Sequence, residues 1–313
     1  MRNTTLFATL TLMVTLVIAV GIALGGGDLA LQDGTPTPVP PPVLGEFDPA
    51  TVAEIDLIAL PLVPEIDERA VALYDAALEA GRDPGAFVKV GDCMTDHPGF
   101  LAPISAGDYD LGDYADLQAV IDHYGAGEVD VFARKSQAAA GGFNTASILD
   151  GLWANPDYCE AGESPLACEF RLANPSVALI MFGTNDLSYL SEAQYDFFLR
   201  SIIAATLDAD VLPILSTFPL RPEFPEQTLL FNQISAQVAA DYGIPLINLY
   251  AALDPLPNSG IDEVETTHMS EPSDGAVCHF IDANLEAGFT VRNLLTLQTL
   301  AALQDAVAVE DVE

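Results

Sequence analysis

Four residues of this sequence have the chemistry that acyl transfer requires. Cys93 can act as a nucleophile, and the Asn185 side chain can donate a hydrogen bond without carrying charge. His268 can take up and return a proton near neutral pH, and Glu265 lies three residues before it. Acyl transfer needs a nucleophile, a base within reach and donors aimed at the developing oxyanion. The residue types therefore predict a hydrolytic site whose nucleophile is a thiol.

The elements that must position these residues alternate between strands and helices. Continuous apolar runs predict buried strands at 87–90, 129–133, 177–182, 211–218 and 244–249. Helical apolar spacing predicts helices at 65–80, 114–124, 191–207, 231–242 and 285–303, with a further helix opened by Gly141 and Gly142. This alternation predicts one α/β domain with a parallel sheet and right-handed crossovers.

The predicted topology brings the chemical residues to one edge of the sheet. Ligands of open α/β sheets bind beyond the carboxyl ends of the strands. Cys93 and Asn185 each follow a predicted strand. His268 lies in a late loop before the last predicted helix, from which it can return to the same edge.

Four blocks of the sequence resemble those of the SGNH, or GDSL-type, hydrolases. Gly-Asp-Cys at 91–93 is similar to the family's Gly-Asp-Ser block, and Gly142 is similar to the glycine of its second block. Gly-Thr-Asn-Asp at 183–186 matches the Gly-x-Asn-Asp block, and Glu-Thr-Thr-His at 265–268 resembles the Asp-x-x-His block. The blocks stand in family order, and the resemblance covers roughly residues 83–305.

This resemblance implies both a fold and a set of roles. The fold would be a three-layer α/β/α, flavodoxin-like domain with a five-stranded parallel sheet, and the activity would be acyl-ester hydrolysis without a metal or other cofactor. Cys93 would be the nucleophile and would also lend its backbone N–H to the oxyanion hole. Gly142 and Asn185 would be the other oxyanion donors. His268 would be the base, and Glu265 would orient it.

Two positions depart from the family pattern. Glu265 replaces an aspartate, and because Asp262 and Glu263 lie nearby, the orienting carboxylate stays open among the three. Cys93 replaces the serine. A thiolate is intrinsically nucleophilic and a neighbouring imidazolium lowers its pKa below ~8.5, but the larger sulfur can displace the attack geometry. A cysteine hydrolase and a catalytically silent module that binds a glycan or ester ligand are therefore both open. His97, close to Cys93, is a rival base.

The four cysteines leave a further alternative. Cys159 and Cys168 lie in a loop rich in proline and glycine, and we expect a local disulfide between them. Cys93 and Cys278 remain. A bond between these two would make the site a redox-regulated one, and cysteine connectivity does not follow from the sequence.

The composition excludes several classes of partner. With 46 acidic and 10 basic residues the net charge is −36, which repels phosphate backbones and excludes nucleic acid as a partner. No spacing of histidine and cysteine resembles a zinc site. A charge of this size destabilises the compact state unless it is screened, so we expect added salt to stabilise the protein.

The N-terminal part has the pattern of a targeting segment. Arg2 precedes an apolar run at 6–24, so 1–27 is expected to be a signal peptide or a membrane anchor. Residues 28–46 form a proline-rich linker, and 47–313 form the hydrolase-like domain. Both outcomes predict an extracellular or cell-surface protein, with possible attachment to the membrane through the apolar run. The expected substrate is a small acyl ester or an acylated glycan.

Overall fold

A computed structural model describes residue 45 and residues 47–127 and 129–310. The chain divides into two units, 1–39 and 40–313, and the described residues all belong to the second. The predicted signal peptide or anchor, and all of the predicted linker except Gly45, lie outside the described residues. None of the described helices combines the length and the apolar character that a membrane crossing requires.

The described part of the chain contains one parallel sheet of four strands in the order β1-β2-β3-β4. The strands are β1 (Asp83–Gly91), β2 (Pro175–Met181), β3 (Leu212–Ser216) and β4 (Leu246–Ile247). Every residue of β2 is buried. This burial is expected for a strand that has parallel neighbours on both sides and helices over both faces.

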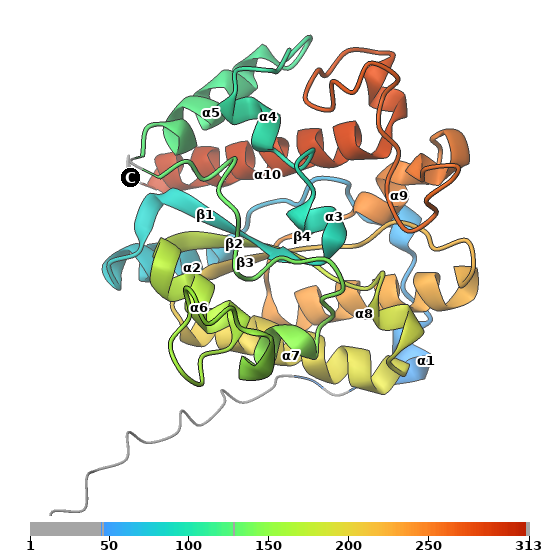
Figure 1. The fold of residues 1–313 in the computed structure, drawn as a ribbon, viewed down its shortest axis with the longest axis horizontal. Coiled ribbons are helices and arrows are strands. Elements are labelled where there is room, and N and C mark those ends of the chain that lie inside the picture. The colour runs from blue at the N-terminus through green and yellow to red at the C-terminus, as the bar shows by residue number, and fades with distance from the viewer. Residues whose placement is uncertain (1–44, 46, 128, 311–313) are drawn as a thin grey trace, which may run out of the picture. The chain divides into compact units, whose positions relative to one another are not determined.

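Helices cover the two faces of the sheet, as predicted (Figure 1). The helices α5 (Gln118–Gly125) and α10 (Gly288–Glu310) lie on one face. The opposite face carries α6 (Pro165–Ala173), α7 (Glu192–Asp208) and α8 (Pro225–Tyr242). The prediction of a three-layer α/β/α fold is therefore confirmed.

Shorter elements complete the domain. The remaining α-helices are α1 (Pro49–Val52), α2 (Glu68–Glu79), α3 (Cys93–Asp96), α4 (Ala102–Ser105) and α9 (Leu249–Leu253). Short 3-10 helices occur at Leu57–Ala59, Ala115–Leu117, Ser147–Leu149, Gly151–Trp153, Asp186–Ser188, Pro257–Gly260 and Asn284–Glu286. The side chain of Asp67 caps α2, and Ser191 and Gln194 form a capping box at α7, so both helices begin close to where the sequence predicts.

The prediction of a strand at 129–133 is wrong. The Asp130 carboxylate accepts a hydrogen bond from the Ala133 N–H at 3.0 Å, and the Asp130 backbone carbonyl accepts one from the Arg134 N–H at 2.8 Å. These bonds close a turn, because an aspartate side chain offers the backbone an alternative to a sheet ladder. Val131 and Phe132 are buried as turn residues, which explains their strand-like apolar pattern.

The fifth strand of the predicted sheet is replaced by a single bridge beside β1. Gly91 and Ala139 form an isolated parallel bridge, in which the Gly91 N–H donates to the Ala138 carbonyl at 3.0 Å. The Ala140 N–H donates back to the Gly91 carbonyl at 3.3 Å. The chain thus reaches the expected edge position only at the level where β1 ends.

The prediction of a helix after Gly142 is also wrong. Asn144 and Ser147 exchange hydrogen bonds: the Asn144 N–H donates to the Ser147 hydroxyl at 2.8 Å, and the Ser147 N–H donates to the Asn144 side chain at 2.9 Å. Local bonds of this kind compete with helical ones. Only the 3-10 helix Ser147–Leu149 forms here.

Gly91 should be intolerant of a side chain. A Cβ at this position would lie 2.3 Å from Thr95 Oγ1 and 2.5 Å from the Met181 carbonyl oxygen. We expect Gly91→Ala to lower the free energy of unfolding by about 2 kcal/mol or more, measured by urea unfolding. Gly125→Ala is the matched control, because nothing lies within 4 Å of its Cβ position. Equal stability of the two variants would contradict the packing seen at Gly91.

Candidate active site

The carboxyl ends of β1 and β2 bring the first two predicted segments together. Gly91 and Met181 are register partners at the ends of these strands. Cys93 follows Gly91 by two residues and Asn185 follows Met181 by four, so both lie at the same edge of the sheet. A Cβ built on Gly141 would lie 4.0 Å from Cys93 Cβ, which places the Gly141–Gly142 pair beside the cysteine.

Cys93 is the first residue of α3 and has a free, partly exposed thiol. The Asp92 carboxylate caps this helix by accepting a hydrogen bond from the Met94 N–H at 3.0 Å. Burial, assisted by the negative charge of Asp92, raises the pKa of the Cys93 thiol to about 11. The thiol is therefore protonated in the resting protein at neutral pH.

Asp92 is itself held in an unusual environment. Burial raises the pKa of this carboxyl to about 6. Its Oδ2 atom is buried and has no hydrogen-bond partner among the described residues. Burial disfavours the charged form of a carboxylate, and an oxygen without a donor does nothing to offset that cost.

A buried arginine of α10 supports the turn that carries Cys93. Arg292 donates through Nη1 to the Met94 carbonyl at 2.7 Å and through Nη2 to Thr95 Oγ1 at 2.9 Å. Its guanidinium lies 3.7 Å from the centroid of the Phe100 ring. Burial lowers the pKa of Arg292 to about 9, and the Asp92 charge opposes that shift. Sequence reasoning missed Arg292, although its place as the single basic residue of α10 was an available signal.

The predicted oxyanion donors differ in how they are held. Asn185 Nδ2 donates one hydrogen bond to the Phe143 carbonyl at 2.8 Å, which orients the amide and leaves its second N–H. Gly142 is exposed and has a φ of +85°, a conformation that favours glycine. Asp186 is structural: its carboxylate accepts from the Thr145 N–H at 2.9 Å and from the Gly183 N–H at 3.1 Å.

Glu265 is the carboxylate that contacts the imidazole. Its Oε2 lies 2.8 Å from His268 Nδ1. Asp262 is occupied elsewhere, because its Oδ1 accepts hydrogen bonds from the N–H groups of Val264 and Glu265 at 2.8 and 2.7 Å. The Glu265 side chain is 69% exposed, so this pair is a solvated one.

No hydrogen bond joins His268 to Cys93 within the described part of the chain. With Nδ1 facing Glu265, Nε2 is the nitrogen left to face a substrate. Catalytic hydrogen bonds are often long before a substrate binds and tighten in the complex. The rival base, His97, stacks on Phe289 at 4.5 Å, and its ring centroid lies 6.4 Å from that of His268. Burial lowers the pKa of His97.

A second arginine links the asparagine segment to the histidine loop. Arg221 Nη1 donates to the Thr184 carbonyl at 3.0 Å, and its Nε donates to Glu223 Oε2 at 3.1 Å. The other Glu223 oxygen accepts from Thr266 Oγ1 at 2.5 Å. This chain of contacts connects Thr184, which precedes Asn185, with Thr266, which lies two residues before His268. Neither Arg221 nor Glu223 stands out in the sequence.

Two of the four cysteines form a disulfide, and the other two are free. Cys159 and Cys168 form a disulfide with a Cα–Cα distance of 5.2 Å. Glu163 lies beside them, but the disulfide occupies both sulfurs and so leaves no thiolate for a metal ion. Cys93 and Cys278 are free in this structure. The Cys278 thiol is buried and accepts a hydrogen bond from Asn293 Nδ2 at 3.4 Å.

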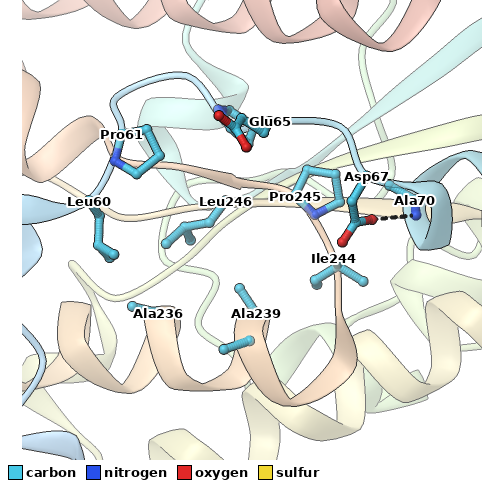
Figure 2. Close-up of a pocket in the computed structure, with 12 residues that line it drawn as sticks. Leu60, Pro61, Glu65, Asp67, Ala70, Ala236, Ala239, Ile244, Pro245 and Leu246 are labelled. Carbon is cyan, nitrogen blue, oxygen red and sulfur yellow. Dashed lines mark hydrogen bonds between the residues drawn. The ribbon is translucent and has the colours of Figure 1, made fainter. Parts of the chain in front are cut away.

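An apolar groove elsewhere on the domain contains none of these residues (Figure 2). It has a volume of about 250 Å³ and lies between α8 and the segment before α2. Leu60, Pro61, Ile244, Pro245 and Leu246 supply much of its wall. The candidate active site is therefore the polar edge of the sheet and not this groove.

The groups at the sheet edge have the chemistry of an acyl hydrolase, and sequence comparison assigns the family. The sequence model of the GDSL-like lipase/acylhydrolase family matches residues 89–272. This match spans more than half of the chain and includes all of the predicted site residues. The chain therefore belongs to the GDSL-like lipase/acylhydrolase family, and this membership supports carboxylic-ester hydrolysis as its activity.

Solved structures similar to this chain include three hydrolases. A lipase/acylhydrolase from Enterococcus faecalis is 21% identical, with 69% of this chain and 95% of that one covered and a TM-score of 0.43. The psychrotrophic esterase EstA from Pseudoalteromonas sp. is 13% identical, with coverage of 71% and 99% and a TM-score of 0.44. A mutant acetyl-xylooligosaccharide esterase from Geobacillus stearmophilus is 16% identical, with coverage of 69% and 93% and a TM-score of 0.42. No curated protein matches the chain.

The ionisation of Cys93 is directly measurable. With a thiol pKa of about 11, the rate of alkylation by iodoacetamide should rise roughly tenfold per pH unit between pH 6 and 9.5. Mass spectrometry of the modified peptide gives the rate, and the Cys278→Ala variant removes the second thiol. A rate that is fast and constant across this range would show a resting thiolate and contradict the assigned protonation state.

Proposed function

We propose that this protein is an exported acyl-ester hydrolase in which Cys93 is the nucleophile and His268 the general base. The observation that carries the proposal is the position of Cys93, whose free thiol starts α3 at the carboxyl edge of the sheet beside the Gly141–Gly142 pair. The family match over 89–272 supports ester hydrolysis as the reaction.

The proposed reaction has two acyl-transfer steps. His268 Nε2 removes the proton from Cys93 Sγ as the sulfur attacks the ester carbonyl, and the alcohol leaves with that proton. Water then attacks the thioester while the imidazole removes its proton. The C–S bond breaks, the carboxylic acid leaves, and the imidazolium returns the proton to Cys93 Sγ. The N–H groups of Cys93 and Gly142 and the Asn185 amide stabilise the oxyanion in both steps. Because the resting thiol is neutral, its proton must move during the attack itself.

The location and the substrate class are parts of the same proposal. The apolar run at 6–24 and the proline-rich segment that follows it are typical of exported proteins. The Cys159–Cys168 disulfide supports an oxidising compartment. A small acyl ester, or an acylated glycan outside the cell, is the substrate class that agrees with this location.

Substitution of Cys93 tests the nucleophile. Cys93→Ala should abolish hydrolysis of 4-nitrophenyl acetate, because no other described side chain takes its place at the start of α3. Cys93→Ser should retain activity, because a hydroxyl is smaller than a thiol and fits the same turn. Hydrolysis that is unchanged in Cys93→Ala would rule out Cys93 as the nucleophile.

A second candidate function is a silent binding module for an ester or glycan ligand. The neutral thiol and the missing hydrogen bond between Cys93 and His268 favour it. The serine variant separates the two functions. A silent wild type with an active Cys93→Ser variant would identify a binding module with an intact scaffold, whereas an active wild type supports the hydrolase.

Glu265 should contribute modestly if the protein is a hydrolase. Its side chain is 69% exposed, so the pair with His268 is worth about 1 kcal/mol rather than the larger value of a buried pair. We expect Glu265→Gln to lower kcat by roughly fivefold, measured with a short-chain nitrophenyl ester. Glu263→Gln removes the same charge from the same loop and should leave kcat unchanged. An equal loss of kcat in both variants would show that the effect comes from the net charge of the loop and not from the pair with His268.

A further inference from the structure

A small polar cavity lies beside the C-terminal end of α3. Its volume is about 180 Å³, and it is bounded by the end of α3, the start of the next loop and the segment 133–139. Seven polar residues contribute to its wall: Lys89, Thr95, Asp96, His97, Arg134, Lys135 and Ser136. Small-molecule sites commonly measure ~300–1,000 Å³. This cavity is smaller and suits a single small group.

Basic residues of the chain are concentrated around this cavity. It contains both lysines of the chain and Arg134, which are three of the ten basic residues, and its one acidic residue is Asp96. The whole chain has 46 acidic residues against those ten. Lys135 Nζ lies 3.6 Å from the Asp96 carboxylate, and Arg134 donates two hydrogen bonds to the buried Glu169 carboxylate. Both of these cations are therefore already paired.

Lys89 is a buried cation without a carboxylate partner. The residue is 7% exposed, and its Nζ donates to the carbonyls of Phe132 at 2.9 Å and Phe100 at 3.3 Å. No carboxylate oxygen lies within 4.0 Å of Nζ in the part of the chain that the structure describes. Two carbonyls leave the third ammonium hydrogen without an acceptor, and a buried cation is unfavourable unless an anion compensates it.

Three neutral groups of the wall also carry hydrogens that lack acceptors. Thr95 Oγ1 accepts from Arg292, so its own hydrogen must be donated elsewhere. The Ser136 hydroxyl accepts a hydrogen bond from the Ala138 N–H at 3.0 Å, so its own hydrogen must also be donated elsewhere. His97 Nδ1 accepts from the Gly99 N–H at 3.1 Å, which leaves the proton on Nε2. None of these hydrogens meets an acceptor among the described residues.

We propose that this cavity is a binding site for a small oxyanion, a carboxylate, phosphate or sulfate group. An oxyanion supplies the acceptors that the wall lacks and the negative charge that Lys89 lacks. The site adjoins the active site, because α3 begins with Cys93 and ends beside the cavity, and the His97 ring lies 6.4 Å from the His268 ring. The oxyanion is either a free ion or a group that an acidic substrate carries. Binding does not depend on catalysis.

Titration with inorganic phosphate tests the site without turnover. We would follow the amide NMR spectrum of the full chain carrying Cys93→Ala while sodium phosphate replaces sodium chloride at constant ionic strength. Saturable shifts should appear at residues 95–97 and 135–139, with a dissociation constant in the millimolar range or below. Linear shifts, or shifts spread over the surface, would show general ion screening and overturn the proposal.

Two charge-matched variants sharpen the result. Lys135→Gln should weaken phosphate binding at least threefold, and folding is not at risk because the side chain is 76% exposed. Arg69→Gln removes the same charge from the exposed surface of α2, away from the cavity wall, and should bind phosphate as tightly as the parent. Equal affinity in Lys135→Gln and Arg69→Gln would overturn the assignment of the ion to this cavity.

The source of the oxyanion can be determined by comparing how phosphate affects the hydrolysis of two esters. If the substrate carries it, phosphate should inhibit hydrolysis of 4-nitrophenyl hemisuccinate, whose carboxylate competes for the site, more strongly than that of neutral 4-nitrophenyl acetate. If it is a free ion, phosphate should change both rates equally. The phosphate titration reports on the cavity even when neither ester is hydrolysed, so failure of the proposed hydrolase function is distinguishable from failure of this site.

Discussion

The tight connection between β1 and α3 is the constraint on which the candidate site depends. Gly91 has no room for a Cβ because Thr95 Oγ1 and the Met181 carbonyl fill that space. Asp92 caps the short helix from its start, and Arg292 holds the carbonyl of its second residue, Met94, from below. A helix of four residues has little stability of its own, so these contacts fix where Cys93 stands.

The same contacts determine the electrostatics of the thiol. Asp92 caps α3 from a buried position, and its negative charge disfavours ionisation of the neighbouring sulfur. Arg292 lies close enough to stabilise Asp92 but is committed to the backbone of α3. The positive charge of Arg221 lowers the pKa of Cys93, and its effect is smaller than that of burial. A neutral thiol is therefore a consequence of how the turn is built, and in the proposed reaction the base must act in the attack step.

Sequence reasoning predicted the central layers well because their signals are local. The apolar run of β2 and the capping residues of α2 and α7 act over a few residues, and the structure agrees with them. The segment 129–133 has the same apolar pattern, but the Asp130 side chain closes a turn there. Arg292 was missed because its partners lie far away in sequence. Arg292 contacts residues almost two hundred positions earlier, and no spacing rule predicts such a pair.

Three of the basic residues are buried near the candidate site. In a chain with 46 acidic residues and 10 basic ones, a basic side chain on the surface has many solvated partners. Arg292, Arg221 and Lys89 are instead buried, and all three donate to backbone carbonyls around β1, β2 and α3. Burying a cation is unfavourable, so its retention here requires a compensating interaction. All three therefore place positive charge close to β1, β2 and α3, against the field of the rest of the molecule.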